Sequence, residues 1–159
     1  MLELLKKGFF SRQYIAKENG AFVAEISISW NHKQSIITIQ GRSLRVEKQK
    51  VDRYAFTLYD GETTLAEVRL NQNHCVGGLC VQYDNQQFVL VNKSWWYPML
   101  LVKSGESLVG DVQMRSIQLK RMFADGICVN LPNDLPLALR VFICWIFLFD
   151  GARQTPSGP

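Results

Sequence analysis

The stretch LPNDLPLALRVFICWIFLFDGARQ, residues 131–154, decides the fold that this sequence predicts. Between Leu135 and Phe149 it holds a single charge, on Arg140. As a helix these residues would extend about 22 Å, whereas a membrane span needs about 20 residues and 30 Å of hydrocarbon. An arginine within the span would also be costly in lipid. The stretch therefore predicts a buried core helix rather than a transmembrane segment.

The residues that flank this stretch predict a helix over about 134–149. Asn133 or Asp134 is a suitable N-cap, and Pro136 is well placed in the first turn. The glycine at position 151 can end the helix. Apolar side chains would lie all around the helix axis, so the helix must be enclosed on every side. A single sheet closed around the helix would provide that enclosure.

The chain from Phe9 to about Phe123 alternates apolar and polar residues in short runs, which indicates half-buried strands. Turn signals divide these runs into hairpins at Asn19-Gly20, Gly41, Asp60-Gly61, Asp84-Asn85 and Ser104-Gly105. At about 8–12 residues for each strand and turn, this region holds roughly ten to fourteen strands. The region therefore predicts an antiparallel sheet of about twelve strands.

Three of the hairpins share a sequence pattern in their second strands. The segments VAEISI, LAEVRL and VGDVQM begin at Val23, Leu65 and Val109, which are 42 and 44 residues apart. The pattern is aliphatic, small, acidic, aliphatic, any, aliphatic. A period near 43 is typical of propeller blades, but three copies are too few for a propeller. A single barrel built from repeated hairpins fits the pattern better.

Strand alternation assigns the residues of the repeat to the two faces of the sheet. In the first copy the inward side is predicted to hold Phe22, Ala24, Ile26, Ile28 and Trp30. The acidic residues Glu25, Glu67 and Asp111 then point outward, which we interpret as a solvated face. The small residues Ala24, Ala66 and Gly110 point inward. Because barrels that fill themselves favour bulky residues there, small ones indicate that something else occupies the middle.

These observations predict a mainly β fold in which a closed antiparallel barrel of about twelve strands surrounds the C-terminal apolar helix. A barrel of that size is too wide for its own side chains to fill, and the helix would close the gap. Arg140 would lie near the entrance and reach water or a carboxylate at a strand end. Residues 1–150 are predicted to form one domain, and residues 151–159 a disordered tail.

The segments GAFVAEISI, GETTLAEVRL and GESLVGDVQM, with the ending LPLALRVFICWIFLF, resemble the tubby C-terminal-like fold. That fold is shared by tubby proteins, the plant LURP-one-related proteins and the phospholipid scramblases. The resemblance covers roughly residues 5–150 and is closest to the LURP-one-related group. The chain is shorter than a tubby domain and lacks the Pro-rich and Cys-rich segments of scramblases. The resemblance implies a non-catalytic module that binds a phosphoinositide or another anionic lipid at a membrane surface.

No segment of this chain matches the phosphate-binding motif of tubby domains, so a candidate site must come from the chain itself. The segment GRSLRVEKQKVDR, residues 41–53, carries five cations against two carboxylates. The cations are Arg42, Arg45, Lys48, Lys50 and Arg53. Such a cluster on a barrel rim would hold an anionic headgroup, at about 1 kcal/mol per cation. The alternative is an ordinary solvated hairpin.

The aromatic residues Trp95, Trp96 and Tyr97 form a second candidate surface. Three consecutive residues of a strand cannot all point inward, so at least one is expected to be exposed. Aromatic side chains at a polar–apolar boundary favour membrane interfaces or protein contacts. The alternatives are that one tryptophan plugs the barrel end, or that the module binds a protein or is structural and binds no lipid.

The remaining features predict neither catalysis nor a cofactor. The two histidines, His32 and His74, lie in loop-like contexts, and Cys75 and Cys80 lack the partners of a zinc site. With 47% apolar residues, 20% charged residues and a net charge of +4, the chain is unlike a dedicated nucleic-acid binder. Its N-terminal residues do not resemble a signal peptide. We therefore expect a cytoplasmic protein without a metal, peripheral at the membrane if it binds lipid.

Overall fold

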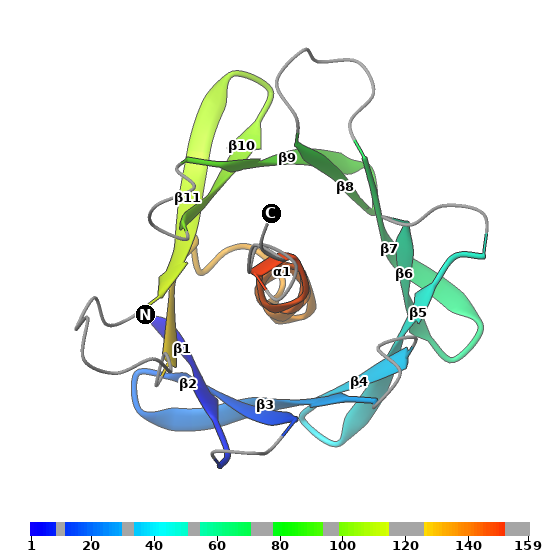
Figure 1. The fold of residues 1–159 in the computed structure, drawn as a ribbon, viewed down its shortest axis with the longest axis vertical. Coiled ribbons are helices and arrows are strands. Elements are labelled where there is room, and N and C mark those ends of the chain that lie inside the picture. Colours follow the sequence, from blue (N-terminus) through cyan, green and yellow to red (C-terminus); the bar gives the residue numbers. More distant parts are fainter. Residues whose placement is uncertain are drawn as a thin grey trace, which may run out of the picture.

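The computed structural model describes residues 1–8, 12–29, 34–50, 55–70, 78–93, 99–114 and 126–151. Twelve antiparallel strands form a closed barrel, and one helix runs through its middle (Figure 1). The strands are β1 (Leu2–Lys6), β2 (Gln13–Glu18), β3 (Ala21–Ile28), β4 (Gln34–Ile39), β5 (Arg42–Lys48), β6 (Phe56–Asp60), β7 (Thr63–Leu70), β8 (Leu79–Tyr83), β9 (Gln86–Asn92), β10 (Met99–Ser104), β11 (Ser107–Met114) and β12 (Gly126–Asn130). The helix is α1 (Leu137–Gly151). The predicted fold class is confirmed.

The barrel is closed by the pairing of β1 with β12, in which Leu2 lies opposite Val129 and Leu4 opposite Ile127. Both strands lie outside the region from Phe9 to Phe123 that the sequence pattern assigned to strands. Each has five residues, and the two are far apart in the chain, so no turn signal marks their pairing. Every other neighbouring pair of strands is consecutive in the sequence.

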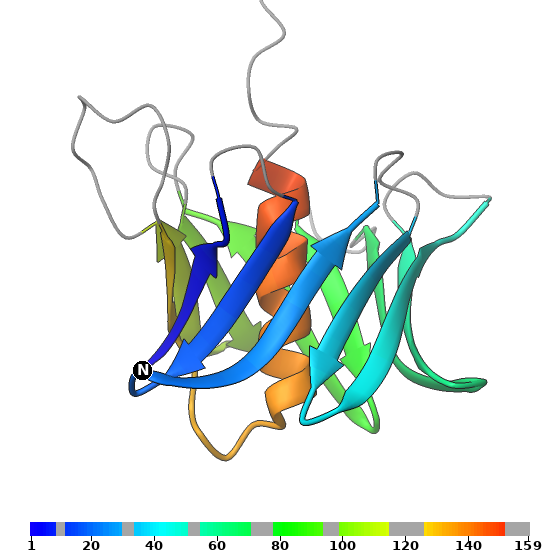
Figure 2. The ribbon, with the colours of Figure 1, turned by 90° about the horizontal axis from the view of Figure 1, so that it is seen from below.

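Five two-residue turns lie at one end of the barrel, which we call the turn end. They join β2 to β3, β4 to β5, β6 to β7, β8 to β9 and β10 to β11. Asn19 and Gly20 both have positive φ, of 50° and 84°, as type I′ turns require. The chain enters the barrel from this end after β12, and α1 then runs toward the other end (Figure 2). We call that other end, where the remaining strand connections begin and finish, the connection end.

The repeated sequence pattern marks a β-bulge in each of the three hairpins. Ala16 pairs with Ala24 and Lys17 with Phe22, which leaves Val23 without a partner. Leu65 and Val109 are the extra residues at the matching positions of the other two hairpins. Each bulge reverses the alternation of side chains toward the turn.

The predicted inward position of Phe22 is wrong, and the bulge in β3 is the reason. Ala24 and Ile26 are buried as predicted, but Phe22 is 61% exposed because it lies beyond the bulged residue Val23. Leu108, beyond the bulge at Val109, is likewise 62% exposed.

The three inward positions that hold small residues require them for two different reasons. Ala24 and Ala66 are buried, as expected for positions that leave room for the helix. At Gly110 an added Cβ would overlap the carbonyl oxygen of Asn130, at the end of the neighbouring strand. Close approach of backbone, rather than the helix, therefore excludes a side chain at the third position.

The helix begins at Leu137, three residues later than predicted, and Gly151 is its last residue rather than part of the tail. The first helical hydrogen bond joins the Arg140 amide to the Pro136 carbonyl, so Pro136, not Asn133 or Asp134, is the N-cap. Residues 152–159, the rest of the predicted tail, lie outside the described residues.

The helix fills the barrel with side chains on all of its faces, as predicted. From residue 139 to residue 147 every side chain is buried. Trp145 is central: its ring centroid lies 4.9 Å from that of Phe56 and 5.3 Å from that of Phe149. Its indole N–H donates to the Ser35 hydroxyl on β4 over 2.9 Å, which satisfies two buried polar groups at once.

Arg140 is a buried charged residue of α1, and Glu18 at the end of β2 is its partner. The Arg140 Nη1 atom lies 2.5 Å from Glu18 Oε1, and Nε donates to the Leu135 carbonyl over 3.1 Å. The two side chains are 6% and 22% exposed. The expectation of a strand-end carboxylate is confirmed. The pair joins the entering helix to the first hairpin.

Candidate functional site

Four of the five cations proposed as one headgroup site lie in the described part of the chain, and these four are spread along the barrel wall. Arg42 begins β5 at the turn end, where it pairs with Asp60, and Lys48 ends the same strand at the connection end. Six residues of strand separate these two, which is about 20 Å. Arg45 lies on the outer wall between them. Lys50 lies two residues after Lys48, so among the described members these two share the connection end.

The other proposed residues fall outside the described part of the chain. These are Arg53, Trp95, Trp96 and Tyr97, together with His32, His74 and Cys75. The described residues that flank the aromatic segment, Lys93 and Met99, lie at the connection end. The Lys93 amide donates to the Met99 carbonyl over 3.0 Å.

In the folded barrel, cations from several strands gather at the connection end. Among the described residues, eight charged side chains lie within two residues of a strand terminus at this end. Seven are cationic, and Glu47 is the single carboxylate. The cations are Lys6, Lys7, Arg12, Lys48, Lys50, Arg69 and Lys93.

The turn end has the opposite balance by the same count. Six described carboxylates lie there against three cations. The carboxylates are Glu3, Glu18, Asp60, Glu62, Asp84 and Glu106, and the cations are Lys17, Arg42 and Lys103. The closed barrel therefore has a basic end and an acidic end, although its net charge is only +4.

Four cations of the connection end have no carboxylate within ion-pair distance in the described part of the chain: Lys6, Lys48, Lys50 and Lys93. Lys7 lies 3.9 Å from Glu25, and Arg69 lies 3.2 Å from Glu67. The Arg12 guanidinium donates to the Ser29 carbonyl over 3.1 Å and thereby joins β2 to β3. The four lysines are thus the charges most available to an anionic partner.

Sequence reasoning missed this arrangement because the cations are far apart in the chain. Lys6, Lys50 and Lys93 belong to three different connections, and no window of sequence holds them together. A signal was nevertheless present, because the predicted turns Asp60-Gly61 and Ser104-Gly105 are each followed directly by an acidic residue, Glu62 and Glu106. Every second connection of an antiparallel meander lies at the same end, and the predicted turns are alternate connections, so the turn prediction alone could have sorted the charges.

The described residues offer few groups suited to chemistry. Burial raises the pKa of the Cys144 thiol to about 12, so this cysteine is not a thiolate at neutral pH. Its Sγ atom lies 3.1 Å from the Arg140 carbonyl oxygen inside the helix. Among the described residues, no three His, Cys, Asp or Glu side chains are grouped so that they could hold a metal ion. Nor is any helix in this part of the chain long and apolar enough to cross a membrane.

Comparison with known proteins finds no matching family model, no matching curated protein and no matching solved structure. The function of the chain must therefore be argued from its own geometry.

Proposed function

We propose that this barrel is a non-catalytic binding module that docks its connection end on an anionic lipid surface. The observation that carries the proposal is the sorting of charge between the two ends of the barrel. The resemblance to tubby-like proteins supports it, because a closed barrel around a C-terminal helix is the fold which that resemblance implied. Docking at this end would direct the carboxylates of the turn end away from the surface.

The magnitude of the charge effect is sufficient for reversible binding. A cation near an anionic membrane surface contributes about 1 kcal/mol, and the attraction fades within a Debye length. Four unpaired lysines would then contribute about 4 kcal/mol. Affinity of that size is weak, so binding should be reversible and should fall as salt is raised.

The test is co-sedimentation with vesicles of phosphatidylcholine alone and with added phosphatidylserine or a phosphoinositide. The variant Lys50→Gln/Lys93→Gln removes two charges from the connection end. We expect it to lower affinity for anionic vesicles about thirtyfold, from about 1 kcal/mol per charge. The matched control Lys17→Gln/Lys103→Gln removes two charges from the turn end and should bind almost as the parent does.

Two results would contradict the proposal. One is binding that does not depend on the anionic lipid. The other is an equal loss of binding in both double variants, which would indicate a response to net charge rather than to the connection end. Because these lysines lie on the surface, thermal unfolding of both variants should match the parent within about 0.5 kcal/mol.

A second candidate function is a protein-interaction module that binds no lipid. Its specific support is the exposure of Phe22 and Leu108, which the bulges turn outward on β3 and β11. Aromatic side chains such as that of Phe22 are enriched in the cores of protein interfaces. Native mass spectrometry beside the vesicle assay distinguishes the two functions, since this candidate predicts complexes without any dependence on lipid.

A further inference from the structure

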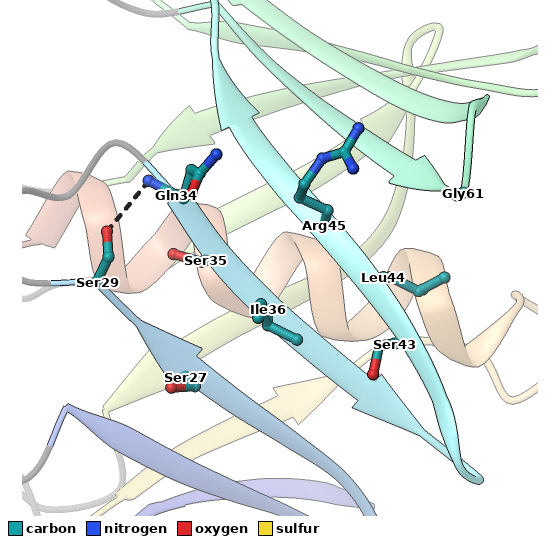
Figure 3. A pocket seen from close by; sticks show the side chains of 9 residues that line it. All are labelled: Ser27, Ser29, Gln34, Ser35, Ile36, Ser43, Leu44, Arg45 and Gly61. Carbon is teal, nitrogen blue, oxygen red and sulfur yellow. Dashed lines mark hydrogen bonds between the residues drawn. The ribbon is translucent and has the colours of Figure 1, made fainter.

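A groove of about 370 Å³ lies on the outer wall of the barrel, over β3, β4 and β5 (Figure 3). Its volume is within the range of sites for small molecules. Small hydroxyl side chains, including Ser27 and Ser43, surround the exposed Ile36. Arg45 projects from the neighbouring strand at one side. Polar groups and one exposed apolar side chain, that of Ile36, thus share a single concave surface.

Arg45 is held in position by its neighbours. Its guanidinium carbon lies 5.1 Å from the centroid of the Tyr59 ring, and its Nε lies 2.7 Å from Glu47 Oε1. The same Glu47 oxygen accepts a hydrogen bond from Gln34 Nε2 over 3.3 Å. These contacts limit the freedom of a side chain that is 47% exposed. They leave both terminal Nη groups without a partner among the described residues.

Ile36 supplies the apolar part of the groove. It lies directly opposite Arg45 on the adjacent strand and opposite Ser27 on the other side. Side chains paired in this way are about 5 Å apart at Cβ. Ile36 is 48% exposed, one of the few large apolar residues of the described wall that face solvent. Arg45 and Ile36 therefore both line the groove, with the Arg45 guanidinium over the Tyr59 ring on β6 and Ile36 exposed on β4.

We propose that this groove binds a small amphiphile by its anionic end, with a carboxylate or phosphate on Arg45 and an apolar body over Ile36. The planar guanidinium matches both anions through two parallel hydrogen bonds, and serine hydroxyls can donate to further oxygens. Because the side chain is already oriented, less freedom is lost on binding. None of the four lysines Lys6, Lys48, Lys50 and Lys93 of the connection end lines this groove.

The test is titration of the isotope-labelled protein, followed by amide NMR shifts. The probes are octanoate and octyl phosphate, with octyl glucoside as a probe of the same apolar body without charge and inorganic phosphate as a probe of the charge without the body. We expect octanoate or octyl phosphate to shift the amides of Ser27, Ile36 and Ser43 saturably. The two control probes should bind at least tenfold more weakly.

The variants Arg45→Gln and Ile36→Ser should each lower affinity about tenfold. Arg69→Gln is the matched control, since Arg69 also pairs with a glutamate two residues away but does not line the groove. Unchanged affinity in Arg45→Gln would overturn the proposal, as would an equal loss in Arg69→Gln or shifts spread over the whole barrel. All three positions are exposed, so the variants should fold.

The amphiphile could be a free acid or part of a lipid surface, and the vesicle assay separates these sources. If Arg45→Gln loses octanoate binding but still binds anionic vesicles, the groove takes a free acid. If it loses both, the groove takes a lipid headgroup. Because the connection-end variant Lys50→Gln/Lys93→Gln should keep octanoate binding, failure of the proposed membrane function and failure of the groove would be told apart.

Discussion

The two ends of the barrel are made from the same twelve strands but differ in construction and in charge. The turn end consists of two-residue turns, carries six described carboxylates against three cations and receives the helix, whose Arg140 pairs with Glu18. The connection end carries seven cations within the described residues, four of them without a carboxylate partner. The turn end is acidic and is joined to the helix by the Arg140–Glu18 pair. At the connection end, four lysines lack a carboxylate partner among the described residues. Under the proposed function, stability and binding would therefore depend on different ends of the barrel.

Removal of the helix should have the largest effect because it affects both ends. A chain ended after Leu131 lacks the side chains that occupy the barrel interior, including Phe142 and Trp145. We expect an insoluble or molten product with no cooperative unfolding transition, measured by solubility and near-ultraviolet circular dichroism. A chain ended after Gly151 is the control and should unfold as the parent does. A soluble, cooperative product of the shorter chain would show that the wall is stable without the helix.

Loss of the Glu18 carboxylate should weaken the turn end alone. Glu18→Gln leaves the Arg140 guanidinium buried without its counter-charge, at a cost of about 3 kcal/mol in the free energy of unfolding. Urea denaturation measures this cost. Glu62→Gln, at the same end but exposed, is the control and should change stability by less than about 0.5 kcal/mol. Equal stability of the two variants would mean that the Arg140–Glu18 pair does not secure the helix.

Substitution at one turn should have a smaller effect. Gly105 has a φ of 61°, a backbone region that costs other residues about 1–2 kcal/mol. We expect Gly105→Ala to lower the free energy of unfolding by about 1 kcal/mol, and Ser107→Ala, in the adjoining strand, to change it little. Hydrogen exchange should locate the loss in β10 and β11. A loss spread over the whole barrel would contradict the view that each turn acts locally.

The architecture could be predicted because its signals are local in the sequence. A turn such as Asn19-Gly20 predicts its hairpin from a few adjacent residues, and the apolar run that contains Arg140 predicts an enclosed helix. The strands β1 and β12 could not be found in this way, since each is stabilised by a partner at the other end of the chain. The position of the helix start was also missed, because Asn133 and Asp134 are good caps that the chain uses for a turn instead.

The candidate site was harder to predict because it depends on which strand ends meet in space. The sequence cluster around Arg42 and Lys48 looked like one basic patch, yet strand geometry places these two at opposite ends. Phe22 was assigned to the interior because a bulge cannot be read from alternation alone. The wall groove at Arg45 and Ile36 requires the register of three strands, which no short segment contains.

The position of the helix after the strands has a consequence for how the protein is made. A ribosome releases all twelve strands before the residues that will occupy their centre. The strand that closes the circle, β12, also emerges last and must find β1 about 120 residues away. Until then the nascent chain exposes the inner face of a sheet, which is prone to aggregate. Until β12 and α1 have emerged, the nascent chain is therefore expected to need chaperones to stay free of aggregation.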